Sequence, residues 1–112
     1  MIYKVKFPGG YEVEDVRNDN IDTHIIVETG EVFFVTLFTL ENVKMLIEMH
    51  NPPVFFWATD MLIVVSLEKK IIKTTIDAIF DEGIFEVVFD KIGNIGSIYG
   101  GNETFKSLIN EI

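Results

Sequence analysis

The chain has 112 residues, which is enough for one domain with a single hydrophobic core. Its 48% hydrophobic content and its lack of cysteine exclude a disordered chain, a disulfide framework, a zinc–thiolate site and a cysteine nucleophile. The formal charge of −9 argues against binding to nucleic acid or to an anionic membrane, and it fits either a basic partner protein or simple solubility.

The N-terminal sequence MIYKVKFPGG lacks the apolar core and the cleavage site of a signal peptide. No stretch of the sequence is long enough to span a bilayer. The absence of cysteine also fits a reducing compartment. We therefore expect a cytoplasmic protein that forms one domain over residues 1–112.

Residues 2–16 are predicted to form a β-hairpin with its loop at residues 8–10, PGG. This register places two oppositely charged pairs across the strands, Lys4 with Glu14 and Lys6 with Glu12. A polar turn at residues 17–20 follows.

A second hairpin is predicted between residues 24–28 and 31–38, with Thr29-Gly30 as a two-residue loop and Glu28 facing Glu31. Its second arm is apolar on both faces, which indicates a central strand beside residues 54–65.

Thr39 is predicted to cap a helix over residues 40–50, which ends at the Asn51-Pro52-Pro53 sequence. One apolar stripe of this helix is expected to be buried, and its members are Leu40, Val43, Leu46, Ile47 and His50.

Residues 54–65, VFFWATDMLIVV, are the most apolar stretch, and we expect the rest of the chain to be organised around them. They form either one kinked strand or two short strands joined by a turn at residues 58–60. The turn is favoured because Asp is common in turns and rare inside strands.

Ser66 is predicted to cap a second helix over residues 67–82, which Gly83 terminates. The buried stripe of this helix is expected to be Ile72, Ile76, Ile79 and Phe80. Residues 84–92 fit a helix or a strand, and a short helix is favoured. Residues 93–101 are glycine-rich and predict a flexible connector to a short C-terminal helix over residues 102–112.

This order predicts an α+β fold. A mostly antiparallel β-sheet would be built from the two N-terminal hairpins and the central strand or hairpin at residues 54–65. The helices at about residues 40–50 and 67–82 would pack on one face of that sheet.

Patterns for catalysis and for metal binding are weak. His24 and His50 have no HExxH spacing and are expected on a strand and at a helix end. The sequence has no GxSxG motif, and the glycine-rich stretch lacks the ending of a P-loop. Asp60 beside Trp57 could act as a general acid, but a turn role is favoured because no second catalytic group is apparent. We therefore expect no enzyme, no metal site and no cofactor.

Several short stretches resemble small acidic bacterial proteins that look like immunity proteins. They include FWATDM at residues 56–61, VSL at 65–67, DEG at 81–83, EDV at 14–16 and FTLEN at 38–42. The resemblance covers about residues 1–92 and leaves the glycine-rich tail outside. Immunity proteins neutralise a cognate toxin by covering it, so the resemblance implies a binding protein for a basic partner such as a toxin.

The candidate contact residues are five acids in predicted loops and helix ends, together with one aromatic: Asp19, Asp22, Asp60, Asp81, Glu82 and Trp57. One alternative is a small ligand-binding or enzyme domain with a pocket between helix and sheet. Another is a structural subunit that forms a homodimer through an edge strand or the C-terminal helix.

Overall fold

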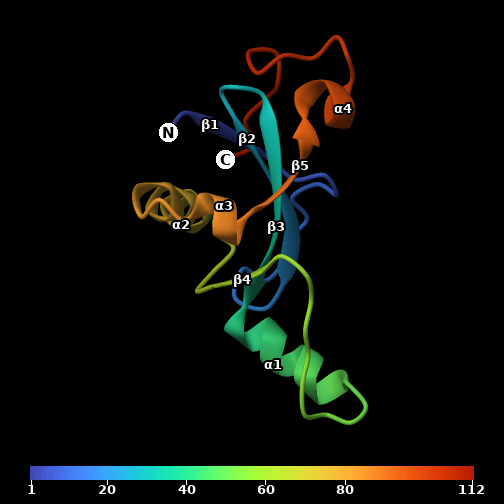
Figure 1. Ribbon diagram of the computed structural model, residues 1–112. Coiled ribbons are helices and arrows are strands. Elements are labelled where there is room, and N and C mark those ends of the chain that lie inside the picture. Colours follow the sequence, from blue (N-terminus) through green and yellow to red (C-terminus); the bar gives the residue numbers. More distant parts are fainter.

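The computed structural model describes residues 1–112 and confirms an α+β fold, with five strands in one mixed, mostly antiparallel sheet and four helices (Figure 1). The strands are β1 (Tyr3–Lys6), β2 (Asn20–Val27), β3 (Glu31–Thr39), β4 (Met61–Val64) and β5 (Asp90–Asn94). The helices are α1 (Leu40–Met49), α2 (Lys69–Asp81), α3 (Phe85–Val88) and α4 (Ile95–Tyr99).

The central strand of the sheet is β3, as its apolar sequence predicts. On one side it pairs with β2, and β2 in turn pairs with β1. On its other side β3 has two neighbours, because β5 lies antiparallel to its first residues and β4 lies parallel to its last four. The prediction that β3 lies beside part of residues 54–65 is therefore confirmed.

The predicted N-terminal hairpin is wrong. The turn after Phe7 does form, with the Gly10 N–H donating to the Phe7 carbonyl at 2.8 Å, but residues 11–16 then leave the sheet. β1 pairs instead with β2, which places Val5 beside Ile25, and both side chains are fully buried. This burial outweighs the exposed Lys–Glu pairs of the predicted register, each worth only a fraction of a kcal/mol.

The second hairpin is confirmed, but its loop has three residues. The register pairs Ile26 with Val32, which leaves Glu28, Thr29 and Gly30 in the turn. Gly30 adopts φ 98°, a left-handed conformation that completes a three-residue loop and that other residues adopt only with strain. Glu28 and Glu31 therefore do not face each other, contrary to the prediction.

The main core lies between α2 and one face of the sheet, which we call the α2 face. α2 contributes its predicted stripe, with Ile72, Ile76 and Ile79 buried and Phe80 half-buried against them. The sheet contributes alternate residues of each strand, as the two-residue period of a strand requires. They are Val5, Ile21, Ile25, Val27, Phe33, Val35, Leu37 and Val64.

The other side of the sheet, which we call the opposite face, is covered by a helix at one end only. Ile26 and Val32 pack there with Ile95 of α4 and with Leu108 of the C-terminal segment. Figure 1 shows α4 and the last residues at one end of the sheet, and α1 at the other. The opposite face near α1 has no helix over it. At this end Phe38 is buried, and its ring lies 5.7 Å from that of Phe56 in the segment that follows α1.

Thr39 caps α1 as predicted, but the helix does not pack on the sheet. It continues from the end of β3 and projects away from the sheet, so only Asn42 of its residues is buried (Figure 1). Leu40, which belongs to the predicted buried stripe, is 66% exposed. The spacing of apolar residues at every third or fourth position predicted the helix correctly. It could not predict which element, if any, the apolar side of the helix packs against.

Residues 54–65 are not the organising element of the fold. Only residues 61–64 form a strand, β4, and they lie at an edge of the sheet. Both predicted arrangements are wrong, because residues 54–57 form no strand. The favoured turn at Thr59-Asp60 does form, with Asp60 at φ 53°. The turn leads from the segment that follows α1 into β4.

The helix boundaries near α2 and α3 differ from the predicted ones by a few residues. Ser66 is not the N-cap of α2, since the helix begins after Glu68 and the Ser66 hydroxyl accepts from the Glu68 N–H at 3.1 Å. Gly83 terminates α2 at φ 72°, as predicted. Residues 84–92 contain both of the predicted alternatives: the short helix α3 comes first, and the start of the strand β5 follows it.

Two predictions for the C-terminal part are wrong. Residues 93–101 are not a flexible connector, because they contain the end of β5 and the helix α4, and Asn94 and Ser97 form a reciprocal capping box. Residues 102–112 form no helix. Their last residues instead extend beside β1, where the Glu111 N–H donates to the Val5 carbonyl at 2.8 Å.

Candidate interaction surface

The most prominent feature outside the sheet is a projecting arm, which we define as α1 and the following residues 50–60. α1 leaves the sheet after Thr39, and the chain re-enters it at Met61, which pairs with Thr36. Residues 50–60 must therefore return over the length of the helix, about 15 Å. Figure 1 shows this hairpin-like arm, and the molecule measures 46 Å along its longest axis against 27 and 26 Å.

The base of the arm is fixed by Thr39. Its hydroxyl accepts from the N–H of Asn42 at 3.3 Å, which caps the first turn of α1. The same hydroxyl contacts the backbone of Asp19, whose carbonyl also accepts from the Thr39 N–H at 3.2 Å. The side chains of Asn20 and Asn42 bond each other at 2.9 Å. These bonds set the direction in which the arm leaves the sheet.

The surface of the arm is unusually apolar. Six large hydrophobic side chains on it are exposed: Leu40, Met45, Met49, Val54, Phe55 and Trp57. Two more, Ile63 and Val65, are exposed in and just after β4. Trp57 is 70% exposed and Met49 is 72% exposed, so neither belongs to the core of this chain. An exposed apolar group of this size is typical of a surface that another molecule covers.

Four of the six predicted contact residues lie at the end of the sheet that carries the arm. Asp22 of β2 is exposed and accepts from the Thr36 hydroxyl at 2.9 Å, and the Thr36 N–H donates to the Asp60 carbonyl at 2.8 Å. Asp19 lies at the base of the arm, and Trp57 lies on the arm itself. The sheet therefore brings together residues that are far apart in sequence.

The other two predicted residues do not join this group. Asp81 and Glu82 are exposed at the C-terminal end of α2. That end of the helix lies near α3, whose Phe85 packs on Phe33 at the start of β3 with ring centroids 5.6 Å apart. The base of the arm is at the other end of β3. Asp81 and Glu82 therefore belong to a different part of the surface.

The carboxylates near the arm have no basic partner. The four ion pairs of the structure use Glu31, Glu68, Asp77 and Glu111. None of them involves Asp19, Asp22, Asp60 or the two glutamates of α1, Glu41 and Glu48. The exposed apolar side chains of the arm are thus accompanied by unpaired negative charge.

Sequence reasoning missed two acids that lie close to this surface. The predicted hairpin pairs Glu12 and Glu14 with lysines, but the loop that carries them leaves the sheet. With Tyr11, Val13 and Asp19 they line an open surface hollow of about 540 Å³. The alternating acids in residues 11–15 could have indicated an acidic surface here. Their match in charge to Lys4 and Lys6 favoured a strand pairing instead.

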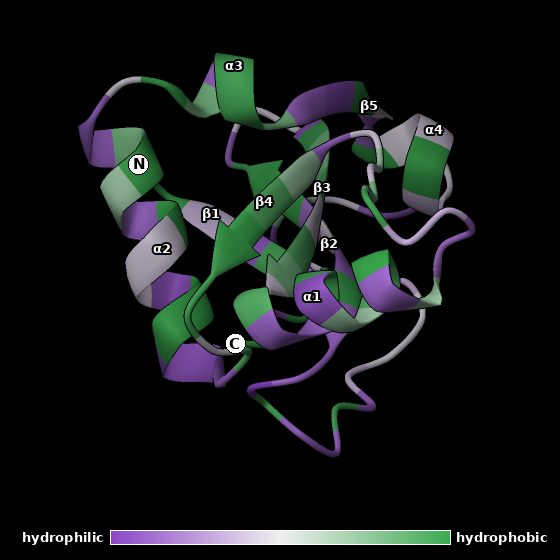
Figure 2. Ribbon diagram, turned by 90° about the horizontal axis from the view of Figure 1, so that it is seen from below, coloured by the Kyte–Doolittle hydropathy of each residue, from purple (hydrophilic) through white to green (hydrophobic).

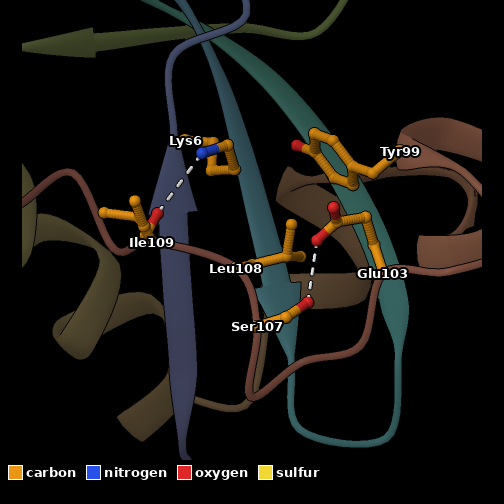
Figure 3. Close-up of a pocket in the computed structure, with 6 residues that line it drawn as sticks. All are labelled: Lys6, Tyr99, Glu103, Ser107, Leu108 and Ile109. Carbon is orange, nitrogen blue, oxygen red and sulfur yellow. Dashed lines mark hydrogen bonds between the residues drawn. The ribbon is translucent and has the colours of Figure 1, made fainter.

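A second hollow, of about 300 Å³, lies between β1, α4 and the C-terminal segment (Figure 3). Its polar side chains bond one another or the backbone. The Ser107 hydroxyl donates to the Glu103 carboxylate at 2.7 Å, and the Lys6 ammonium donates to the Ile109 carbonyl at 3.4 Å. The Lys6 ammonium also lies 3.6 Å from the Glu111 carboxylate. This hollow therefore presents little free hydrogen-bonding capacity to a ligand.

The Tyr99 side chain of the same hollow bonds His24 of β2. A neutral His24 accepts the Tyr99 O–H at its Nδ1 atom, 2.5 Å away. Burial lowers the pKa of His24, against a smaller opposing effect of Asp22, and this favours the neutral ring. Burial, with the Glu111 carboxylate, raises the pKa of Tyr99 to about 12. The pair is a structural link between the sheet and α4.

Other kinds of site find little support in the geometry. No group of three or more His, Asp or Glu side chains is placed to hold a metal ion. None of the five surface hollows is lined by a residue of α2, so no pocket opens between that helix and the sheet. None of the helices combines the length and the hydropathy that are needed to cross a bilayer.

Comparison of the chain with family models, with curated proteins and with solved structures finds no match.

Proposed function

We propose that the chain is a non-enzymatic binding protein that covers a basic partner protein, in the manner of an immunity protein that inhibits a toxin. The observation that carries this proposal is the projecting arm, where exposed apolar side chains lie beside carboxylates without a basic partner. Apolar and aromatic side chains supply most of the affinity of a protein interface, whereas unpaired charges steer the encounter.

The first test uses the protein that co-purifies with the chain from its native host, identified and then purified separately. We expect that protein to be basic and to lose its activity when the purified chain binds it. Trp57→Ala should weaken the complex by about 2 kcal/mol, as the loss of a central interface aromatic does. Ile109→Ala is the matched control, because Ile109 is 74% exposed but lies on the C-terminal segment.

The second test asks whether local charge steers association. The double variant Asp22→Lys with Glu48→Lys reverses two carboxylates near the arm and should slow association by about tenfold at low salt. The double variant Asp81→Lys with Glu82→Lys changes the net charge equally at the other end of the sheet and should have a small effect. Equal slowing by both variants would show that only total charge matters, and no slowing by either would remove the electrostatic part of the proposal.

A structural homodimer is the alternative that the same exposed apolar side chains support. Light scattering on the purified chain separates the two. A stable dimer that Trp57→Ala dissociates would assign the arm to a second copy of the chain instead of a basic partner.

A further inference from the structure

The outer edge of the sheet beyond β3 consists of two short strands placed end to end. β5 pairs with Glu31–Phe34, and β4 pairs with Thr36–Thr39. No strand lies outside either of them. Any further strand that joined the sheet on this side would therefore lie along β4, β5 or both.

The hydrogen bonds between β3 and β4 show which backbone groups of β4 are free. The Thr36 N–H donates to the Asp60 carbonyl, and in a parallel ladder the bonded residues alternate along the strand. Leu62 and Val64 therefore face β3, whereas the N–H and carbonyl groups of Met61 and Ile63 point away from the sheet. No hydrogen bond joins β4 to any segment other than β3. Such a row of free groups is a template for another strand.

β4 lacks the features that usually prevent a free edge from pairing. β5 carries the charged residues Asp90 and Lys91, and its pairing register shifts between Lys91 and Gly93. β4 has the sequence MLIV, with no charge, no proline and no bulge. Ile63 is 47% exposed, and Figure 2 shows the strand hydrophobic along its length. Charges and bulges protect edge strands, so β4 is the unprotected part of this edge.

The charge around β4 indicates which kind of strand it would accept. Asp60 precedes the strand, Glu68 follows it, and the pairing registers place Asp90 at the adjoining end of β5. Neither Asp60 nor Asp90 takes part in an ion pair. A second copy would bring its own unpaired Asp60 and Asp90 to the same edge, which like-charge repulsion disfavours. A segment that carries lysine or arginine would place opposite charges there.

We propose that the basic partner binds β4 with an extended segment, which adds to the sheet as its next strand. This inference rests on the proposed function and names the mode of binding. Backbone bonds to Met61 and Ile63 would hold the segment in register. The side chains of these two residues lie on the opposite face with Phe38, whose ring is 5.7 Å from that of Phe56, and they offer apolar contacts to every second residue of the segment.

The experiment measures amide hydrogen exchange of the full chain with a synthetic peptide of alternating lysine and valine. The peptide should slow exchange of the Met61 and Ile63 amides several-fold. It should change the Leu62 and Val64 amides little, because they already bond to β3. A peptide with glutamate in place of lysine should give no such protection, and neither should one in which every backbone nitrogen is methylated.

Two variants connect the protection to the edge. Ile63→Pro removes an N–H that the sheet does not use, so the fold is retained and protection at Met61 is lost. Ile63→Lys keeps the backbone N–H but adds a positive charge that repels the lysines of the peptide, so it should also reduce the protection. Val87→Lys, at an 88% exposed position of α3, is the matched control and should leave the protection unchanged.

Three results would overturn the inference: no slowing at Met61 and Ile63, slowing confined to other strands, or equal slowing by the glutamate peptide. Protection that appears without peptide and rises with protein concentration would assign the edge to a second copy and would also overturn it. None of these results depends on the co-purified partner, so the charge-reversal and Trp57 tests of the proposed function can succeed or fail separately.

Discussion

The N–H of Glu111 donates to the carbonyl of Val5 at 2.8 Å, which attaches the end of the chain to its first strand. Two side chains of the same segment accept from β1 and the residue after it, Asn110 from the Val5 N–H at 2.9 Å and Glu111 from the Phe7 N–H at 3.0 Å. The C-terminal segment thus satisfies the β1 edge of the sheet, whereas the β4 edge has no such cover.

Asn110→Ala should lower the free energy of unfolding by about 1 kcal/mol, because the Val5 N–H loses its acceptor. Asn102→Ala is the matched control, since Asn102 is exposed and its side chain makes no hydrogen bond, and we expect a change within about 0.5 kcal/mol. Urea denaturation measures both. Equal effects of the two variants would contradict a stabilising role for the C-terminal segment.

The Tyr3 hydroxyl donates to the Asp77 carboxylate at 2.6 Å, which joins β1 to α2. This bond, with that of Lys73, lowers the pKa of Asp77. The stabilisation is therefore complete above the ordinary pKa of an aspartate and is lost as the pH falls through the lowered pKa of the folded chain. Tyr3→Phe should cost about 1 kcal/mol at neutral pH and less in acid.

Tyr11→Phe provides the control for this pH dependence. The Tyr11 hydroxyl donates to the Leu67 carbonyl, which does not titrate. Its loss should cost a similar free energy of unfolding that changes little between neutral pH and pH about 3. Urea denaturation of both variants at several pH values makes the comparison. A Tyr3→Phe cost that stays constant in acid would show that Asp77 is not the group responsible.

His24 should make the chain less stable in weak acid. Burial lowers its pKa, so the folded chain binds a proton less readily than the unfolded chain. Its contribution to stability is therefore complete above the ordinary histidine pKa, about 6.5, and declines as the pH falls from there through the lowered pKa of the folded chain. His24→Gln should remove this decline. Thermal unfolding between pH about 7 and 5 measures it, and an unchanged decline in the variant would contradict the assignment.

Gly93 should tolerate no side chain. Its φ is 152°, and a Cβ atom there would lie 2.7 Å from the Ser97 hydroxyl, which bonds the Asn94 backbone in the capping box of α4. Gly93→Ala should destabilise the chain by about 1–3 kcal/mol. Gly101→Ala has open space around it and should stay within about 0.5 kcal/mol of the wild type. Denaturant unfolding distinguishes them, and similar stabilities would mean that the capping box can move aside.

The positions of several elements could be predicted because local signals agreed there. Thr39 followed by an apolar helical period predicted α1, and Gly83 predicted the end of α2. Gly30 between two apolar arms predicted the hairpin of β2 and β3. For the candidate surface, the sequence named Asp22, Asp60 and Trp57 as contact residues, but it grouped them with Asp81 and Glu82.

The pairing of the first strand could not be predicted from neighbouring residues. Residues 11–16 carry charges that match those of β1, whereas β2 places the fully buried Ile25 beside the fully buried Val5. Charge pairs at the surface contribute less than buried apolar area, so the distant strand is the better partner. The same preference leaves Glu12 and Glu14 on an exposed loop near the arm.

By itself the sequence determined an α+β fold, a negative surface and the hydrophobic periods of the helices, because these depend on composition and on residues a few positions apart. The tertiary structure alone decided which of the apolar stretches are buried. Residues 54–65 are more apolar than any other stretch, yet their strand β4 lies at an edge of the sheet. β3 is the central strand, with β2 on one side and β4 and β5 on the other. An apolar side chain is buried only when another element covers it, and coverage depends on contacts between segments far apart in the chain.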